Sequence, residues 1–191
     1  MRLFIGVDLD EPVRAAAAAV TDQLRTELQR VDPDFTARWI PHANLHITLW
    51  FLGEVADDTA EAVMAALRRP FRDLSFPLVL RGCGAFPRSG PPRVLWVGAP
   101  RGAAEMQGLY EGLSDRLVPL GFPREQRPYS PHLTLARVKE SGRGTARAIR
   151  QLLAETPADC GTSAVTAVTL FRSRLSPRGA AYEPILRVPL A

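Results

Sequence analysis

The chain has 191 residues, 46% of them hydrophobic and 23% charged, with a formal net charge of +4 and a pI near 9.7. These values fit a globular protein with a sizeable core, and no segment is of low complexity. No apolar run approaches the 18 residues of a transmembrane helix, and the N-terminal apolar run is too short for a signal peptide. The basic excess suits an anionic partner such as a phosphate ester or RNA, although a generally basic surface would give the same charge.

The basic residues are almost all arginine, and Lys139 is the only lysine. Arginine suits phosphate recognition, but genome composition explains the bias equally well and is the explanation we prefer. Two cysteines, Cys83 and Cys160, lie far apart and form neither a disulfide framework nor a CxxC pair. We therefore expect a cytoplasmic protein whose two thiols serve as small core residues.

Apolar periodicity predicts four helices and about twice as many strands along the chain. The helices are expected at 13–30, 59–69, 103–120 and 145–154. The strands are expected at 2–9, 35–40, 45–51, 74–86 (interrupted at Gly82 and Gly84), 93–98, 132–138, 164–173 and 182–189. Turns or loops are expected at 41–44, at Gly53, and at 87–92, 121–131, 141–144 and 176–179. Because several strands are hairpin partners, we expect an α+β fold with antiparallel or mixed sheets rather than a doubly wound fold.

One tetrapeptide occurs twice, as His46-Ile47-Thr48-Leu49 and as His132-Leu133-Thr134-Leu135. On a strand, alternate side chains share a face, so each copy pairs a histidine with a threonine and turns two apolar residues toward a core. Each copy follows a helix and a proline-containing stretch, and each precedes another helix. We therefore expect residues 1–191 to form a single domain of two interleaved, pseudo-symmetric lobes. Outer helices would cover two sheets, and one motif from each lobe would line a central cleft.

Two histidines that face one cleft can act as a general acid and a general base. One can take a proton from an attacking water while the other gives a proton to the leaving oxygen of a phosphodiester. Threonine hydroxyls on the same face, here Thr48 and Thr134, can donate hydrogen bonds to the non-bridging oxygens. A single His-x-Thr pattern is weak evidence, because a strand histidine is usually structural and threonine favours strands. The duplication favours function, because packing does not require the same pattern to recur.

The third histidine, His42, lies four residues before His46 in a proline-containing loop. Three histidines could ligate zinc, but an i, i+4 pair is close only on a helix. We therefore interpret His42 as an exposed loop residue and expect no metal site.

The residues around the two motifs resemble the signatures of the 2H phosphoesterases, in particular the RNA 2′,3′-cyclic phosphodiesterases, also called 2′-5′ RNA ligases. The similar stretches are 38–41 with 44–53, 127–137, and the opening strand 3–9. The resemblance implies a bilobal α+β fold and hydrolysis of a 2′,3′-cyclic phosphate to a 2′-phosphomonoester without a cofactor. It also implies that His46 is the proton donor and His132 the proton acceptor, an assignment that the residue chemistry alone leaves open. Related enzymes also join RNA ends through a 2′-5′ bond.

Residues beside the motifs are candidates for substrate binding. Arg137 and Arg127 flank the second motif and could hold phosphate, and Tyr129 and Trp39 could stack on a base. For both aromatic residues, packing in the core or at its rim is an equal alternative. Arg137 lies five residues after His132, so a regular strand would place it on the opposite face, unless a bulge or the strand end intervenes.

The residues also allow two other functions. The chain could be a 2H phosphodiesterase for another small cyclic or 2′-5′ linked nucleotide, or a non-catalytic RNA-binding module. For the phosphodiesterase we expect a monomer that acts on RNA ends or small nucleotides bearing a cyclic phosphate and has no membrane partner.

Overall fold

The computed structural model describes residues 1–142, 144–176 and 179–191. The described helices are α1 (Glu11–Val31), α2 (Asp57–Arg68), α3 (Ala103–Leu117) and α4 (Ala146–Glu155), with short 3-10 helices η1 (His42–Asn44) and η2 (Val118–Leu120). The described strands are β1 (Arg2–Val7), β2 (Thr36–Trp39), β3 (Ile47–Glu54), β4 (Phe76–Arg81), β5 (Cys83–Phe86), β6 (Val94–Gly98), β7 (His132–Glu140), β8 (Asp159–Val165), β9 (Ala167–Ser176) and β10 (Gly179–Pro189).

The strands form two antiparallel sheets of unequal size. The larger sheet has the order β10-β9-β1-β3-β7-β6-β5, with β2 paired to β7, and the smaller sheet pairs β4 with β8. The predicted α+β class is therefore confirmed. The two motif-bearing strands, β3 and β7, are neighbours in the larger sheet, so the sheet continues from one half of the molecule into the other.

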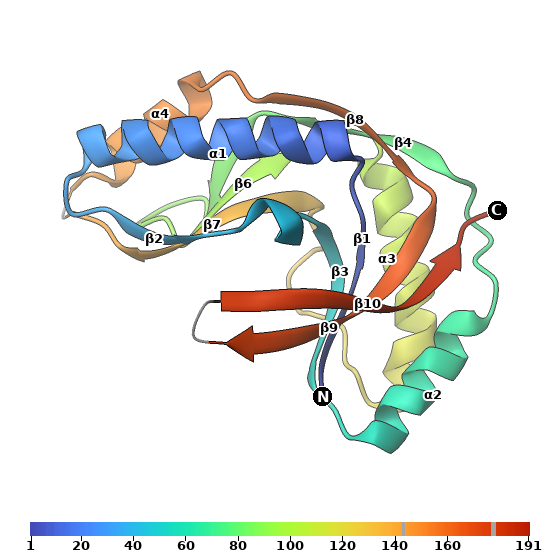
Figure 1. Cartoon of the computed structure of the whole chain (residues 1–191). Helices are drawn as coiled ribbons and strands as arrows, with labels where there is room; N and C mark the ends of the chain where they lie inside the picture. The colour runs from blue at the N-terminus through green and yellow to red at the C-terminus, as the bar shows by residue number, and fades with distance from the viewer. Residues whose placement is uncertain (143, 177–178) are drawn as a thin grey trace.

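The helices divide between the two ends of the molecule (Figure 1). One group, α1 and α4, lies at the end that contains β2, β6 and β7, and α2 and α3 lie at the end that contains β1 and β3. The β9–β10 hairpin extends the sheet beyond β1. No described helix is long and apolar enough to cross a membrane.

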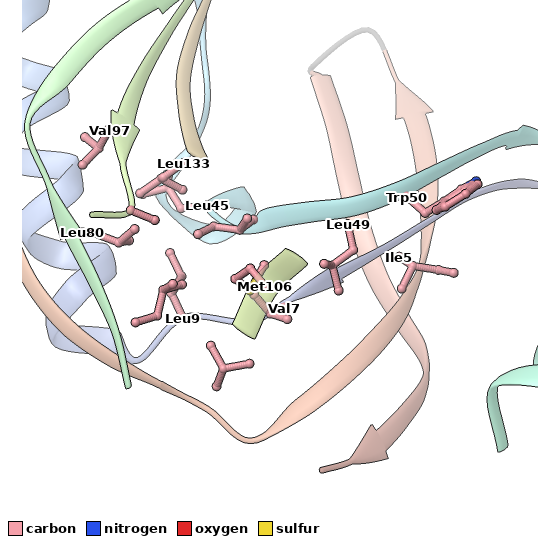
Figure 2. Packing of buried hydrophobic residues seen from close by; sticks show 14 of the residues in the cluster. Ile5, Val7, Leu9, Leu45, Leu49, Trp50, Leu80, Val97, Met106 and Leu133 are labelled. Atoms are coloured by element: carbon pink, nitrogen blue, oxygen red, sulfur yellow. The ribbon is translucent and has the colours of Figure 1, made fainter. Parts of the chain in front are cut away.

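One hydrophobic core runs through both ends. Figure 2 shows Leu133 and Leu45 beside the β3–β7 junction, with Met106 of α3 and Val7 of β1 continuing the same cluster. All four are buried. The described residues therefore bury their apolar side chains in one continuous core.

The predicted elements agree with the structure except near proline, glycine and small or polar residues, where the apolar periodicity is weak. The third helix ends at Leu117 and continues as η2, because Pro119 cannot donate the next helical hydrogen bond. The first motif strand runs to Glu54, with Gly53 inside it at φ +77° rather than closing it. The expected turns 141–144 and 176–179 include residues 143, 177 and 178, which lie outside the described residues.

One strand, β8, was not predicted as a separate element. We expected a single strand over 164–173, whereas the structure has β8 and β9 on either side of Thr166. The buried positions of β8 include Cys160, Ser163 and Val165, which are too small or too polar to give a strong apolar period. Cys160 is buried, Cys83 is half-buried, and both are free thiols.

Candidate active site

A single ladder pair joins the two motif-bearing strands. Ile47 of β3 lies opposite Leu133 of β7, and both side chains are fully buried. Successive residues of a strand point to opposite faces, so the histidine and threonine that flank each buried residue share the other face of the sheet. The antiparallel register sets the histidine of each motif across from the threonine of the other. The resulting patch has local two-fold symmetry and is called the motif face, and its members are His46, Thr48, His132 and Thr134.

Both histidine rings are held in the same way. Nδ1 of His46 donates to the carbonyl of Asn44, and Nδ1 of His132 donates to the carbonyl of Ser130, each over 2.7 Å. A carbonyl oxygen only accepts, so Nδ1 carries a proton in both rings and Nε2 is the nitrogen left to react. Nε2 of His46 lies 3.0 Å from the hydroxyl of Thr48. Each motif thus presents one imidazole nitrogen that can exchange a proton with a bound molecule.

Aromatic side chains surround His46. The ring centroids of Phe4, Tyr182 and Phe171 lie 4.7, 5.2 and 5.9 Å from that of the imidazole. Gly6 of β1 allows the close approach of the strands, because a Cβ there would lie 2.6 Å from a carbonyl oxygen of β3. His46 is therefore a packed ring whose orientation is fixed by its neighbours.

The surroundings of His132 are more open. Phe86 meets its ring edge to face at 5.0 Å, and a pocket of about 290 Å³ lies beside the two rings. The residues that line this pocket include Arg81, Phe86, Trp96, Ser130, Pro131 and His132. The two motifs therefore share the hydrogen bond from Nδ1 to a backbone carbonyl but differ in the side chains that enclose each histidine.

A bulge follows each motif at the same position. In β3, Ile5 pairs with Trp50 and Gly6 with Thr48, so Leu49 has no partner on β1. In β7, Leu95 pairs with Ala136 and Trp96 with Thr134, so Leu135 has no partner on β6. The pairs Leu49–Trp50 and Leu135–Ala136 are buried, and a bulge of one residue reverses the parity of the residues after it.

The bulges place the fifth residue after each histidine on the motif face. In the second motif this residue is Arg137, which settles the parity difficulty for that arginine. In the first motif it is Phe51, a side chain that is 53% exposed and has the guanidinium of Arg2 over its ring. Equivalent positions of the two motifs therefore carry a cation in one copy and an aromatic ring in the other.

The pKa of each motif histidine lies below its ordinary value of 6.5. Burial is the main cause for both rings, and the positive charge of Arg137 lowers both pKa values further, while the carbonyl contacts raise them. The symmetry is broken by one carboxylate: Asp8 raises the pKa of His46, and among the described residues no carboxylate acts on His132 in the same way. Asp8 also accepts a hydrogen bond from the buried Thr169 hydroxyl at 2.9 Å. The carboxylate of Asp8 thus favours the protonated form of His46.

These pKa shifts predict a loss of stability in mild acid. The unfolded chain has histidine pKa values near 6.5, so below that pH it binds more protons than the folded protein. We expect the free energy of unfolding to fall as the pH drops from about 7 through the lowered pKa values of His46 and His132. Urea unfolding at a series of pH values measures this change. A protein with both histidines replaced by glutamine should show a flatter profile, and an equally steep one would contradict the assignment.

Tyr129 lies beside the first motif as part of an aromatic stack. Its ring stacks on Tyr110 of α3 at 4.7 Å, and Tyr110 stacks on Trp50 of β3 at 4.9 Å. Its hydroxyl donates to the carbonyl oxygen of Thr48 at 3.1 Å, and burial raises its pKa above the ordinary value. Tyr129 therefore links the loop before the second motif to the strand of the first.

The structure does not bring Trp39 to the motif face. Trp39 packs against Phe35, with the guanidinium of Arg25 of α1 over its ring, and it pairs with the buried Ala136 of β7. Arg127 is exposed in the loop that precedes the second motif. Neither residue contacts the motif histidines through any interaction that the structure describes.

His42 is a separate histidine at the surface. Its Nε2 lies 3.1 Å from a carboxylate oxygen of Glu11 at the start of α1. Within the described residues, no three His, Cys, Asp or Glu side chains gather in a way that could hold a metal ion.

Three residues near the motif face were not singled out as site residues from the sequence. Asp8 and Asn44 lie inside the stretches that resemble the family signatures, but nothing in the local pattern indicates their contacts. Asn44 donates its side-chain amide to the carbonyl of Ala180 at 2.6 Å, which ties η1 to the β9–β10 hairpin. The third residue, Arg38, lies on β2 directly opposite Arg137. Only the sheet register reveals this pairing, because the two arginines are far apart in sequence.

An α+β fold with one His-x-Thr pair at each of two adjacent strands, His46 directly before β3 and His132 at the start of β7, is the arrangement expected of a two-histidine phosphoesterase. The sequence model of the 2′-5′ RNA ligase superfamily matches residues 12–176. The chain therefore belongs to the 2′-5′ RNA ligase superfamily, which confirms the resemblance seen in the sequence.

Individual relatives agree with this family. The RNA 2′,3′-cyclic phosphodiesterase of Aeropyrum pernix is 37% identical over 149 residues, which cover 78% of this chain and 83% of that protein. The protein of the same name from Archaeoglobus fulgidus is 32% identical over 97% of this chain and 98% of its own length.

Solved structures share the fold over nearly the whole chain. TT0787 of Thermus thermophilus superposes with a TM-score of 0.75 at 30% identity, covering 100% of this chain and 98% of that one. LigT of E. coli complexed with 3′-AMP superposes with a TM-score of 0.74 at 28% identity, covering 99% and 97%.

Proposed function

We propose that this chain hydrolyses the 2′,3′-cyclic phosphate at RNA ends to a 2′-phosphomonoester. The observation that carries the proposal is the motif face, where two histidines and two threonines meet with two-fold symmetry across β3 and β7. Relatives named RNA 2′,3′-cyclic phosphodiesterase support the choice of substrate. The reverse joining of RNA ends through a 2′-5′ bond is part of the proposal, because acid–base catalysis by the same groups can run in both directions.

In the proposed reaction, Nε2 of His132 accepts a proton from water as the water oxygen attacks phosphorus. The bond between phosphorus and O3′ breaks, and Nε2 of His46 donates its proton to the departing oxygen. The hydroxyls of Thr48 and Thr134 donate to the non-bridging oxygens, and the charge of Arg137 stabilises the negative charge that develops there. Exchange with solvent then returns a proton to His46 and removes one from His132.

The assignment of roles rests on the surroundings of the two rings. A general acid must be protonated before the reaction; burial disfavours the protonated form of both rings and lowers both pKa values, but the carboxylate of Asp8 opposes this effect at His46 and acts on that ring alone. His132 is the ring that borders the open pocket, where an attacking water can enter. Both observations support His46 as the proton donor and His132 as the proton acceptor.

The same structure supports proposals for the oligomeric state, the location and the roles of the remaining candidate residues. We propose a monomer, because all four motif residues come from one chain, and a cytoplasmic location, because both cysteines are free thiols. We propose that no metal is needed, because the two histidines supply both the acid and the base. Arg137 is the proposed phosphate-binding residue. Arg127 stays a candidate for binding RNA outside the motif face. We propose Tyr129 as a residue that positions the motifs through its stack, and Trp39 as a packing residue of β2.

The test is turnover of a short RNA that ends in a 2′,3′-cyclic phosphate, measured in excess chelator. We expect a 2′-phosphate product, which phosphorus NMR distinguishes from a 3′-phosphate. Parallel assays with 2′-5′ oligoadenylate and with a cyclic phosphate of ADP-ribose identify a preference for another small nucleotide. A 3′-phosphate product would contradict the proposed cleavage of the bond between phosphorus and O3′, and tight binding without turnover from pH 5 to 8 would indicate a binding module instead.

A further inference from the structure

Two arginines lie side by side on the motif face. Arg38 of β2 is directly opposite Arg137 of β7, between the pairs Ala37–Val138 and Trp39–Ala136. Directly opposite residues of an antiparallel pair share one face of the sheet, with Cβ atoms about 5 Å apart. Because the bulge turns Arg137 to the motif face, Arg38 lies there too, whereas Trp39 packs toward α1.

This arginine pair has no carboxylate partner within the described residues. Every described salt bridge involves other groups, and like charges directly opposite on a sheet are destabilising. The β9–β10 hairpin provides a comparison, because Arg172 and Arg174 also lie close together and both bind Glu183, at 2.7 and 3.0 Å. The pair on the motif face therefore has two positive charges available for an external anion.

The single negative charge of a cyclic phosphodiester needs only one of the two arginines as its counter-charge. A cyclic phosphodiester carries one negative charge, and Arg137 is the cation whose charge acts on both motif histidines. The guanidinium of Arg38 extends toward the β9–β10 hairpin, where it lies 4.0 Å from the position of a Cβ on Gly179. Arg38 is therefore the second cation, on the side of the motif face that borders β2 and the hairpin.

We propose that Arg38 binds the phosphodiester on the 5′ side of the terminal nucleotide, next to the cyclic phosphate held by the motif face. The inference rests on the proposed function and names the part of the substrate that the motifs leave unspecified. RNA ends carry this second phosphate, whereas a nucleoside 2′,3′-cyclic phosphate with a free 5′-hydroxyl does not. Arg38 thus selects polynucleotide ends over nucleosides.

The test compares two substrates that differ only at the 5′ position. These are adenosine 2′,3′-cyclic phosphate with a 5′-hydroxyl and the same nucleotide with a 5′-phosphomethyl ester, which is a minimal phosphodiester. The wild-type ratio of kcat/KM should favour the ester. In Arg38→Gln this ratio should fall by about 10- to 100-fold, the loss expected for one charge-assisted contact. Most of the change should appear in KM, and the salt dependence of KM for the ester should weaken.

Two further variants make the result specific. Arg38→Lys keeps the charge and should restore part of the preference. Arg25→Gln removes one positive charge next to Trp39, on the other face of β2, and should leave the ratio unchanged. An equal fall for both substrates, or an unchanged ratio in Arg38→Gln, would overturn the proposal. Wild-type turnover of the 5′-hydroxyl substrate reports separately on the proposed function, because that substrate lacks the second phosphate.

Discussion

Replacing either motif histidine with alanine is expected to lower kcat for cyclic-phosphate hydrolysis by about 10²- to 10⁴-fold. Each variant removes the imidazole whose Nε2 is free to transfer a proton on its side of the motif face. The two losses should differ when the leaving group changes. A diester with a p-nitrophenyl leaving group needs little protonation, so it should recover much of the rate in His46→Ala and little of it in His132→Ala.

The third histidine is the matched control for this experiment. His42→Ala removes an exposed imidazole that pairs with Glu11, outside the motif face, and should keep wild-type kcat. Unfolding midpoints of all three variants must show that each is folded at the assay temperature. Full activity in His132→Ala with chelator present would contradict the two-histidine mechanism, and equal rescue of both motif variants would contradict the division into acid and base.

Leu133→Ala is expected to lower the free energy of unfolding by about 2–5 kcal/mol. Leu133 has no exposed surface and pairs with Ile47 of β3 on one side and Val97 of β6 on the other. Its truncation opens a cavity at the point where the two halves of the large sheet meet. Urea denaturation measures the change, with the slope m expected to stay the same.

Leu74→Ala provides the same chemical change at the surface. Leu74 is 71% exposed, so its truncation should change the free energy of unfolding by no more than about 0.5 kcal/mol. A loss below about 1 kcal/mol in Leu133→Ala would show that the junction tolerates a cavity. The packing that holds the two motifs together would then have to lie elsewhere in the core.

The repeated tetrapeptide predicted the motif face because a two-residue period is a local property of strands. His46 and Thr48 share a face for the same reason as His132 and Thr134, and the buried pair Ile47–Leu133 confirms the apolar side. The helices were predictable because their apolar residues recur at helical spacing. These features depend only on residues that are close together in the sequence.

The remaining features depend on partners that are distant in the sequence. The bulges at Leu49 and Leu135 are visible only from the pairing of neighbouring strands, so the face occupied by Arg137 could not be derived from β7 alone. The register between β2 and β7 likewise determines the neighbour of Arg38. β8 was missed because its inward side chains include Cys160 and Ser163, whose size and polarity give no apolar signal.

The unequal residues after the two bulges bear on the orientation of the substrate in the proposed reaction. A fully symmetric site would bind a cyclic phosphate in two equivalent orientations, and the leaving oxygen would face one histidine in the first and the other histidine in the second. Arg137 at one position and Phe51 at the other remove this equivalence, and Asp8 beside only one histidine removes it a second time. In the proposed reaction, the small differences between two otherwise matching halves therefore select one of the two orientations of the substrate.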